Sequence, residues 1–184
     1  MIGQWEIVPL DRSHDRKEFD CNEADLNDYL SRFARQNHEN GVARTFVAID
    51  PQQPTRILGY YSLAVGNLEK ANFPASSIKR LPNFPVAIAR LARLAVDEKV
   101  QSKGIGEDLL IDALLRCLKI ANNAGIFAII IDAKHEHAKA FYTRYEFESL
   151  PDQPLTLWLP IKALKHLQQS NDLDNTIHED RETY

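Results

Sequence analysis

The sequence predicts a single domain of the α/β or α+β class. A chain of 184 residues with 44% hydrophobic content can bury one substantial core but is short for two. Segments with the alternation of strands and segments with the 3.6-residue repeat of helices follow one another in the order β-α-β-β-β-α-β-α-β. The chain contains no internal repeat and no low-complexity linker that would divide it.

The first part of the chain is predicted to form a strand, a helix and a hairpin. Residues 4–10 alternate as a strand does, and an apolar stripe at helical spacing follows, which Asp20 or Asn22 can cap and Gly41 can end. Residues 44–65 contain two strands around a proline-containing break and are expected to pair as an antiparallel hairpin. The stripe consists of Leu26, Tyr29, Leu30, Phe33 and Ala34.

The middle of the chain is predicted to form a long connection and a central strand. Residues 69–85 contain three prolines and little periodicity, so they are expected to be irregular. Residues 86–96 have the length and the β-branched content of a central strand, although Arg90 and Arg93 interrupt it.

The last part of the chain adds two helices and two strands. Apolar residues repeat about every 3.6 positions from Ile105, and Gly125 ends that helix. The apolar run at 126–133 is expected to be a strand covered on both faces. A short helix at 136–145 and a strand at 155–161 follow.

The net negative charge of the chain comes from residues 171–184. The formal net charge is -4, and residues 171–184 hold five acidic residues against one Arg, which leaves 21 basic and 21 acidic residues in 1–170. We therefore expect a neutral domain over residues 1–170 and a flexible acidic tail over 171–184. An acidic lid over a basic surface is the alternative interpretation of the tail.

The sequence pattern does not indicate a membrane protein, a secreted protein or a metal-binding protein. No stretch approaches the ~20 apolar residues of a membrane span, and the start of the chain lacks a signal-peptide pattern, so a soluble cytoplasmic protein is expected. Cys21 and Cys117 have no metal-binding or disulfide spacing, so both are expected to be reduced packing residues.

The segment from Gln101 to Gly106 joins the central strand to the long helix. The first turn of a helix has unpaired N–H groups and about half a positive charge, so it can bind a phosphate where no side chain covers the backbone. Gly104 and Gly106 leave the backbone open, and Lys103 adds positive charge. A plain turn is the alternative. The spacing matches neither the P-loop nor the dinucleotide fingerprint, whose third glycine position holds Leu109.

Two motifs together resemble the GNAT acetyltransferase superfamily. Its acetyl-CoA pattern [QR]xxGx[GA] is met by Gln101, Gly104 and Gly106 after a hydrophobic strand, and "AKAFYTRYEF" is similar to its downstream "AxxFYxxxGF". With "FDCNEADLNDYL", "ARTFVAID" and "GYYSLAV", the chain resembles the GNAT toxins of bacterial toxin–antitoxin modules from about Phe19 to Leu164.

The resemblance implies a GNAT fold, with a mixed and mostly antiparallel sheet flanked by helices, and an enzyme that acetylates the α-amino group of aminoacyl-tRNA. It implies acetyl-CoA as co-substrate, no metal, a homodimer and a ribbon-helix-helix antitoxin, with no DNA binding by this chain alone. Tyr142 matches the general acid for the coenzyme A thiolate. The implied coenzyme-binding residues are Leu94, Ala95, Val96, Gln101, Ser102, Lys103, Gly104, Ile105 and Gly106.

An α-amine fits the residues better than a Lys side chain as the acceptor. An α-amino group with a pKa near ~7.8 is partly neutral at pH 7, whereas Lys near ~10.4 needs a base. Asp97 or Glu98 could be that base, although solvated loop charges are the simpler interpretation. Arg90 and Arg93 are candidate substrate-binding residues, or equally partners of carboxylates. Further basic candidates are Arg32, Arg35, Lys79 and Arg80.

The chain departs from the superfamily pattern at two positions. Glu146 stands where the second motif prefers glycine, and His135 stands where many members have Asn. His135 and His137 are expected to be exposed, with no metal or base role. Two alternative functions are a GNAT that acetylates a small amine or a protein Lys or N-terminus, and a coenzyme A-binding module without catalysis.

Overall fold

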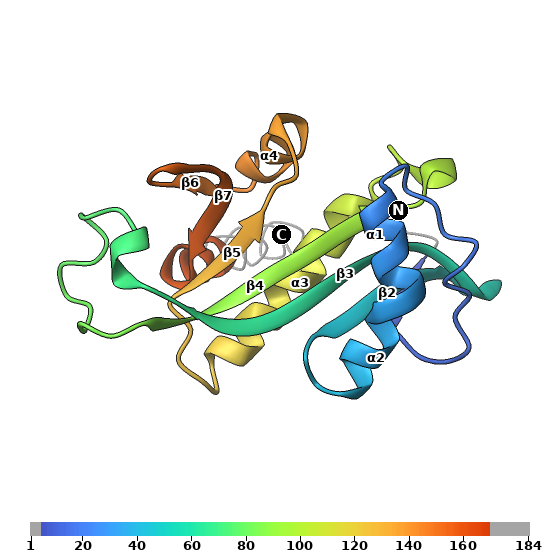
Figure 1. The fold of residues 1–184 in the computed structure, drawn as a ribbon, viewed down its shortest axis with the longest axis horizontal. Coiled ribbons are helices and arrows are strands. Elements are labelled where there is room, and N and C mark those ends of the chain that lie inside the picture. Colours follow the sequence, from blue (N-terminus) through green and yellow to red (C-terminus); the bar gives the residue numbers. More distant parts are fainter. Residues whose placement is uncertain (1–4, 170–184) are drawn as a thin grey trace, which may run out of the picture. The chain divides into compact units, whose positions relative to one another are not determined.

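A computed structural model describes residues 5–169, so the predicted acidic tail lies outside the described residues (Figure 1). The chain divides into two compact units. The first comprises Met1–Gly66 and Ala89–Arg116, and the second comprises Asn67–Ile88 and Cys117–Tyr184.

The strands of the first unit confirm the predicted hairpin and the predicted strand at residues 86–96. Its strands are neighbours in the order β1-β2-β3-β4, and both β1–β2 and β2–β3 are antiparallel. Strand β4 has the predicted bounds, whereas β3 is longer than expected. The strands are β1 (Glu6–Pro9), β2 (Arg44–Asp50), β3 (Gln53–Leu68) and β4 (Val86–Val96).

The predicted first helix is present as three consecutive pieces. Helix α1 (Ala24–Asp28) and helix α2 (Ala34–Glu39) are joined by a π-helical turn, η1 (Tyr29–Phe33). A π-helical turn contains more residues than an α-helical turn, so it rotates the side chains that follow it. Phe33, expected on the apolar stripe, is the last residue of this turn and is 44% exposed.

The predicted end of this helix is confirmed, but its predicted cap is wrong. Gly41 has a φ of +71° just after α2. The N-cap position belongs to Glu23, not to Asp20 or Asn22. The carboxylate of Asp20 instead accepts the backbone N–H of Asn22 at 2.9 Å and the side-chain amide of Asn27 at 2.7 Å. Those bonds hold the loop before the helix and leave Asp20 unavailable as its cap.

Helix α3 (Ile105–Ala121) packs on β3 at a position that requires glycine. A Cβ at Gly59 would lie 2.8 Å from Leu109 Cδ1 and 3.0 Å from the carbonyl oxygen of Ala95. One turn further along α3, the hydroxyl of Tyr61 donates to Asp112, whose carboxylate also accepts from Arg116 at 2.8 Å. These contacts fix α3, and thereby the loop before it, against the sheet of the first unit.

The second unit contains three antiparallel strands and an aromatic core. Strands β5 and β6 both pair with β7, which lies between them. Phe73, Phe127 and Trp158 form the centre of the core, with ring centroids 5.1–6.2 Å apart. Strand β6 and a helix at residues 161–169 were not predicted from the sequence. The elements are η2 (Lys70–Asn72), β5 (Ala128–Asp132), α4 (Glu136–Thr143), β6 (Glu148–Leu150) and β7 (Gln153–Pro160).

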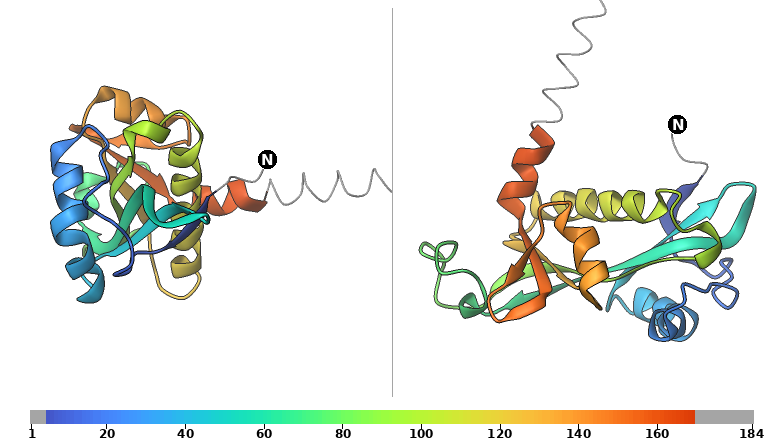
Figure 2. Two further views of the ribbon diagram at one scale, coloured as in Figure 1. Left: turned by 90° about the vertical axis from the view of Figure 1, so that its right-hand side faces the viewer. Right: turned by 90° about the horizontal axis from the view of Figure 1, so that it is seen from above.

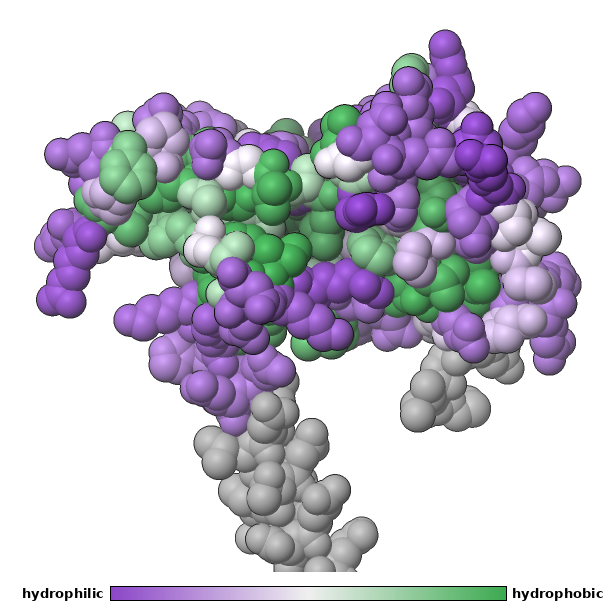
Figure 3. All heavy atoms as spheres, turned by 90° about the horizontal axis from the view of Figure 1, so that it is seen from below, coloured by the Kyte–Doolittle hydropathy of each residue, from purple (hydrophilic) through white to green (hydrophobic). Residues whose placement is uncertain are grey.

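On the face drawn in Figure 3, apolar side chains gather in extended areas with polar side chains around them. No helix among residues 5–169 is long and apolar enough to cross a membrane. The large apolar side chains that are exposed are Phe33, Val42, Val65, Phe84, Ile111 and Leu115.

Candidate active site

The chain leaves β4 through a turn that the buried carboxylate of Asp97 holds. Asp97 is 3% exposed. Its Oδ1 accepts the backbone N–H of Lys99 at 3.0 Å, and its Oδ2 accepts that of Asp20 at 3.3 Å. The prediction of a solvated Asp97 is therefore wrong, because this carboxylate is buried on backbone amides. Its position directs the chain from β4 into the short η3 helix (Glu98–Val100).

The predicted phosphate loop is an exposed turn between η3 and α3. The side-chain amide of Gln101 donates to the carbonyl oxygen of Val96 at 3.1 Å, which closes the turn. Ser102 and Gly104 have left-handed φ angles of +62° and +92°. A Cβ at Gly104 would meet nothing within 4 Å, so the space beside this backbone is open. Glycine thus supplies both a conformation that other residues rarely adopt and an uncovered surface.

The start of α3 is suited to an anion. The carbonyl oxygen of Gly104 accepts the N–H of Asp108 at 3.1 Å, which begins the helical hydrogen bonds and leaves the preceding N–H groups without such partners in the helix. The carboxylate of Asp108, which could oppose an anion, is held by the indole N–H of Trp5 at 2.9 Å. Ile105 is buried and anchors the turn, and Lys103 is exposed.

At the end of β4 the side chains are buried or half-buried, and the backbone packs closely against β3. Ala95 is buried, and Leu94 and Val96 are half-buried. The close approach at Gly59 sets the carbonyl oxygen of Ala95 against β3. Gly59 was not predicted as a functional position, although a glycine inside a strand pattern indicates a close backbone approach.

Arg93 on β4 lies on an aromatic ring. Its guanidinium carbon is 3.7 Å from the ring centroid of Tyr29, which belongs to the π-helical turn. The hydroxyl of Tyr29 accepts a hydrogen bond from Ser62 at 3.2 Å, and Ser62 is bonded to Thr45 at 2.7 Å. Tyr29 was predicted only as part of an apolar stripe, so its contact with Arg93 is new. Arg90 is half-buried on the same strand.

Tyr142 lies in α4 of the second unit. Its ring packs edge-on against Phe141 and Phe147, at centroid distances of 5.1 and 6.2 Å. Burial raises the pKa of Tyr142 to about 12. The phenol therefore stays protonated throughout the neutral and mildly alkaline range, as a proton donor must.

The two departures from the GNAT pattern flank Tyr142. His135 is the N-cap of α4, and its Nδ1 accepts the backbone N–H of Ala138 at 3.1 Å. Asn is among the best N-cap residues, so the two residue types can fill the same role at this position. Glu146 has a φ of +65°, so the chain keeps the left-handed turn that glycine would favour. Both histidines, His135 and His137, are exposed as predicted.

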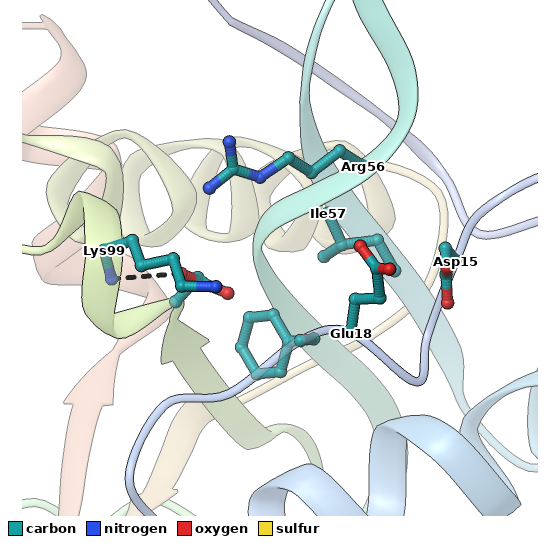
Figure 4. A pocket seen from close by; sticks show the side chains of 7 residues that line it. Asp15, Glu18, Arg56, Ile57 and Lys99 are labelled. Atoms are coloured by element: carbon teal, nitrogen blue, oxygen red, sulfur yellow. Dashed lines mark hydrogen bonds between the residues drawn. The ribbon is translucent and has the colours of Figure 1, made fainter.

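A polar hollow, lined in part by Asp97, lies in the first unit. Asp15 and Glu18 from the N-terminal segment, Arg56 from β3 and Lys99 from η3 line it, above Phe19 and Ile57 (Figure 4). With the carboxylate of Asp97, three carboxylates and two cations line this hollow.

Thiol and metal chemistry have no support among residues 5–169. Cys21 and Cys117 are buried and free, as predicted, and burial raises the pKa of the Cys117 thiol to about 12. A thiol with so high a pKa is not a nucleophile at neutral pH. Within these described residues, no group of three or more His, Cys, Asp or Glu side chains could hold a metal ion.

The sequence pattern of the acetyltransferase (GNAT) domain matches residues 41–149. A tRNA-acetylating toxin of Mycobacterium tuberculosis (strain ATCC 25618 / H37Rv) is 39% identical to the chain, covering 91% of this chain and 98% of that protein. The chain therefore belongs to the GNAT acetyltransferase family.

Solved structures of GNAT toxins resemble this fold. A mutant of KacT superposes with a TM-score of 0.85 at 29% identity, covering 90% of this chain and 99% of that one. AtaT complexed with acetyl-methionyl-tRNAfMet superposes with a TM-score of 0.82 at 28% identity, covering 89% and 98%. A mutant of AtaT bound to the C-terminus of the antitoxin AtaR and acetyl-CoA has a TM-score of 0.77 at 26% identity, covering 90% and 98%.

Proposed function

We propose that this protein is an acetyl-CoA-dependent toxin that acetylates the α-amino group of aminoacyl-tRNA and so blocks translation. The observation that carries the proposal is the open, left-handed backbone of Gly104 at the start of α3, in a chain that is 39% identical to a tRNA-acetylating toxin over nearly its whole length. An uncovered helix start fits the pyrophosphate of coenzyme A, and AtaT has been solved with acetyl-CoA.

In this proposal the loop from Gln101 to Gly106 and the end of β4 bind different parts of acetyl-CoA. Backbone N–H groups of the loop, with the mobile charge of Lys103, bind the pyrophosphate. Backbone groups of Leu94, Ala95 and Val96 bind the pantetheine arm and the thioester carbonyl. Because these groups are fixed before the reaction, one such donor can stabilise a developing oxyanion by about 3 kcal/mol. Ser102 and Ile105 shape the turn, and the side-chain amide of Gln101 holds it closed.

Tyr142 supplies the proton that the leaving sulfur needs. Acetyl-CoA, when bound, presents its acetyl group as a thioester. The acceptor nitrogen forms a bond to the acetyl carbon and releases a proton, while the sulfur leaves and gains one from Tyr142. Since a thiol has a pKa near ~8.5, the phenol is a weaker acid than the thiol it generates. We therefore expect the donation to accompany C–S cleavage, with Tyr142 protonated again afterwards.

An α-amine suits the site because both carboxylates in the turn after β4 are engaged in hydrogen bonds. Both oxygens of Asp97 accept backbone N–H groups, and Glu98 accepts the side-chain amide of Asn22 at 2.9 Å. An α-amino group near pKa ~7.8 is partly neutral without a base. Arg93, oriented by Tyr29, and Arg90 are the proposed contacts to the substrate.

The proposed partners are those of a toxin. AtaT has been solved with its antitoxin AtaR, and we infer a ribbon-helix-helix antitoxin for this chain. We also infer a homodimer that binds no DNA by itself and acts in the cytoplasm, where aminoacyl-tRNA occurs. A GNAT domain over residues 1–170, followed by the acidic segment 171–184 that lies outside the described residues, remains our proposal for the domain organisation.

Labelled acetyl-CoA incubated with a complete set of charged tRNAs tests this function. We expect label on the α-nitrogen of one or a few amino acids, and none on uncharged tRNA. Charged tRNA whose α-amine has been replaced by a hydroxyl is the matched control and should stay unlabelled. Label on a small amine or on protein lysines, with no label on any charged tRNA, would refute the proposal.

A further inference from the structure

Positive charge is concentrated in one stretch of an otherwise balanced chain. Between Glu69 and Asp97 the sequence has no acidic residue, whereas residues 1–170 as a whole hold 21 basic and 21 acidic residues. The basic residues of this stretch are Lys70, Lys79, Arg80, Arg90 and Arg93. Nucleic-acid binding depends more on such a local excess of positive charge than on a high net charge of the whole protein.

The connection that carries the first three of these cations is firmly attached to the second unit. Phe73 is buried against Trp158, and Ile78 and Leu81 pack on the same aromatic core. The ammonium group of Lys70 donates to the carbonyl oxygen of Leu81 at 2.9 Å and to the side chain of Asn83 at 3.2 Å. These bonds tie one end of the connection to the other.

The same connection also exposes two cations and one aromatic ring. Lys79 and Arg80 are exposed, and Phe84 is 64% exposed between Pro82 and Pro85. The connection runs out from β3 and returns into β4, drawn in green at the left of Figure 1 and of the right-hand view in Figure 2. The flanking prolines limit the backbone, so little conformational entropy is lost when a partner covers the ring.

These features fit RNA better than another copy of this chain. An exposed aromatic ring beside Lys and Arg is how proteins hold unpaired nucleotides, with a base on the ring and phosphates on the cations. A two-fold contact through the same loop would bring like charges together. We propose that Lys79, Arg80 and Phe84 form an RNA-binding loop that holds an unpaired nucleotide of the tRNA substrate. This inference rests on the proposed function for the identity of that RNA.

Binding of uncharged tRNA tests the loop independently of acetylation. Stacking of one base contributes about 1–3 kcal/mol, so Phe84→Ala should weaken tRNA binding about tenfold in fluorescence anisotropy, and Phe84→Trp should restore it. With charged tRNA, the same loss should appear in KM and not in kcat. The KM for acetyl-CoA should not change. Leu115→Ala, at another exposed apolar side chain, is the matched control and should bind tRNA normally.

Salt dependence tests the two cations. Each phosphate contact on a single strand contributes about 0.7 to the slope of log affinity against log salt, so Lys79→Ala with Arg80→Ala should lower that slope by about 1.4. Lys119→Ala, which removes an exposed charge from α3, should leave the slope unchanged.

Unchanged tRNA affinity in Phe84→Ala would overturn the inference. If that variant also changes its oligomeric state in sedimentation, Phe84 belongs to a contact between copies. If the wild-type chain binds tRNA through this loop but acetylates no charged tRNA, the proposed function is wrong and the RNA-binding role of the loop is retained.

Discussion

Helices α3 and α4 begin in opposite ways. Gly104, just before α3, has no side chain and leaves open space beside its backbone. His135, just before α4, covers the start of its helix by accepting the N–H of Ala138. The first start is therefore free to receive an anion, whereas the second is closed by the chain itself. An open helix start suits binding, and a capped one suits the rigid support of Tyr142.

The largest expected effect is at α4, in the chemical step. Tyr142→Phe removes the proton donor and should lower kcat by about 10²- to 10⁴-fold, while the Kd for acetyl-CoA, measured by calorimetry, stays near the wild-type value. Growth inhibition by the expressed protein should disappear. Tyr145→Phe, just beyond the same helix, is the control and should retain activity. A fully toxic Tyr142→Phe protein would exclude Tyr142 as the acid.

The next effect is at α3, in binding. Gly104→Val fills the open space and should weaken acetyl-CoA binding by about 100-fold, since it covers the amides that hold the pyrophosphate. Gly41→Val is a matched control, because Gly41 also has a left-handed φ and no neighbour within 4 Å. Both variants should lose about 1–2 kcal/mol of unfolding free energy, measured in urea. Equal coenzyme affinity in the two variants would show that the loop is a plain turn.

The contrast between the two starts could be predicted only in part from the sequence. The glycine spacing and the strand at 86–96 locate the loop, because apolar periodicity and glycine are local signals. The burial of Asp97 and the contact of Arg93 with Tyr29 depend on segments more than sixty residues apart. The π-helical turn and the three-residue β6 are too short to give a periodic pattern. Local patterns therefore predict elements, and packing decides which charges are buried.

A smaller effect is expected in the pH dependence of kcat/KM. The rate should rise about tenfold per pH unit below the pKa of the acceptor α-amine, near ~7.8, and then level off. Because burial raises the pKa of Tyr142 to about 12, the phenol is still protonated at pH 10, and no decline should occur by that pH. An amide-linked aminoacyl-tRNA analogue avoids ester hydrolysis in this measurement. A decline that begins near pH 9 would place a different acid in the site.

The cap of α4 is expected to contribute to stability by a modest amount. His135→Ala removes the acceptor for the N–H of Ala138 and should cost about 1 kcal/mol of unfolding free energy in urea, whereas His135→Asn should retain most of it. The coenzyme affinity of both variants should be unchanged, because this start does not bind the pyrophosphate. Equal stability of the Ala and Asn variants would mean that the hydrogen bond does not stabilise α4.

The smallest effect is expected at the end of α4, where Glu146 stands in a left-handed conformation. A residue with a Cβ loses about 1–2 kcal/mol of unfolding free energy in this conformation, and glycine does not. Glycine also makes the unfolded chain more flexible, and this offsets part of the stabilisation that the substitution provides. Glu146→Gly should therefore raise the unfolding free energy by about 0.5 kcal/mol and leave kcat unchanged. Asp152→Gly is the comparison, since Asp152 has a φ of +59° and Asp tolerates this region better than Glu. A larger gain at Asp152 than at Glu146 would show that backbone strain is not what the two substitutions relieve.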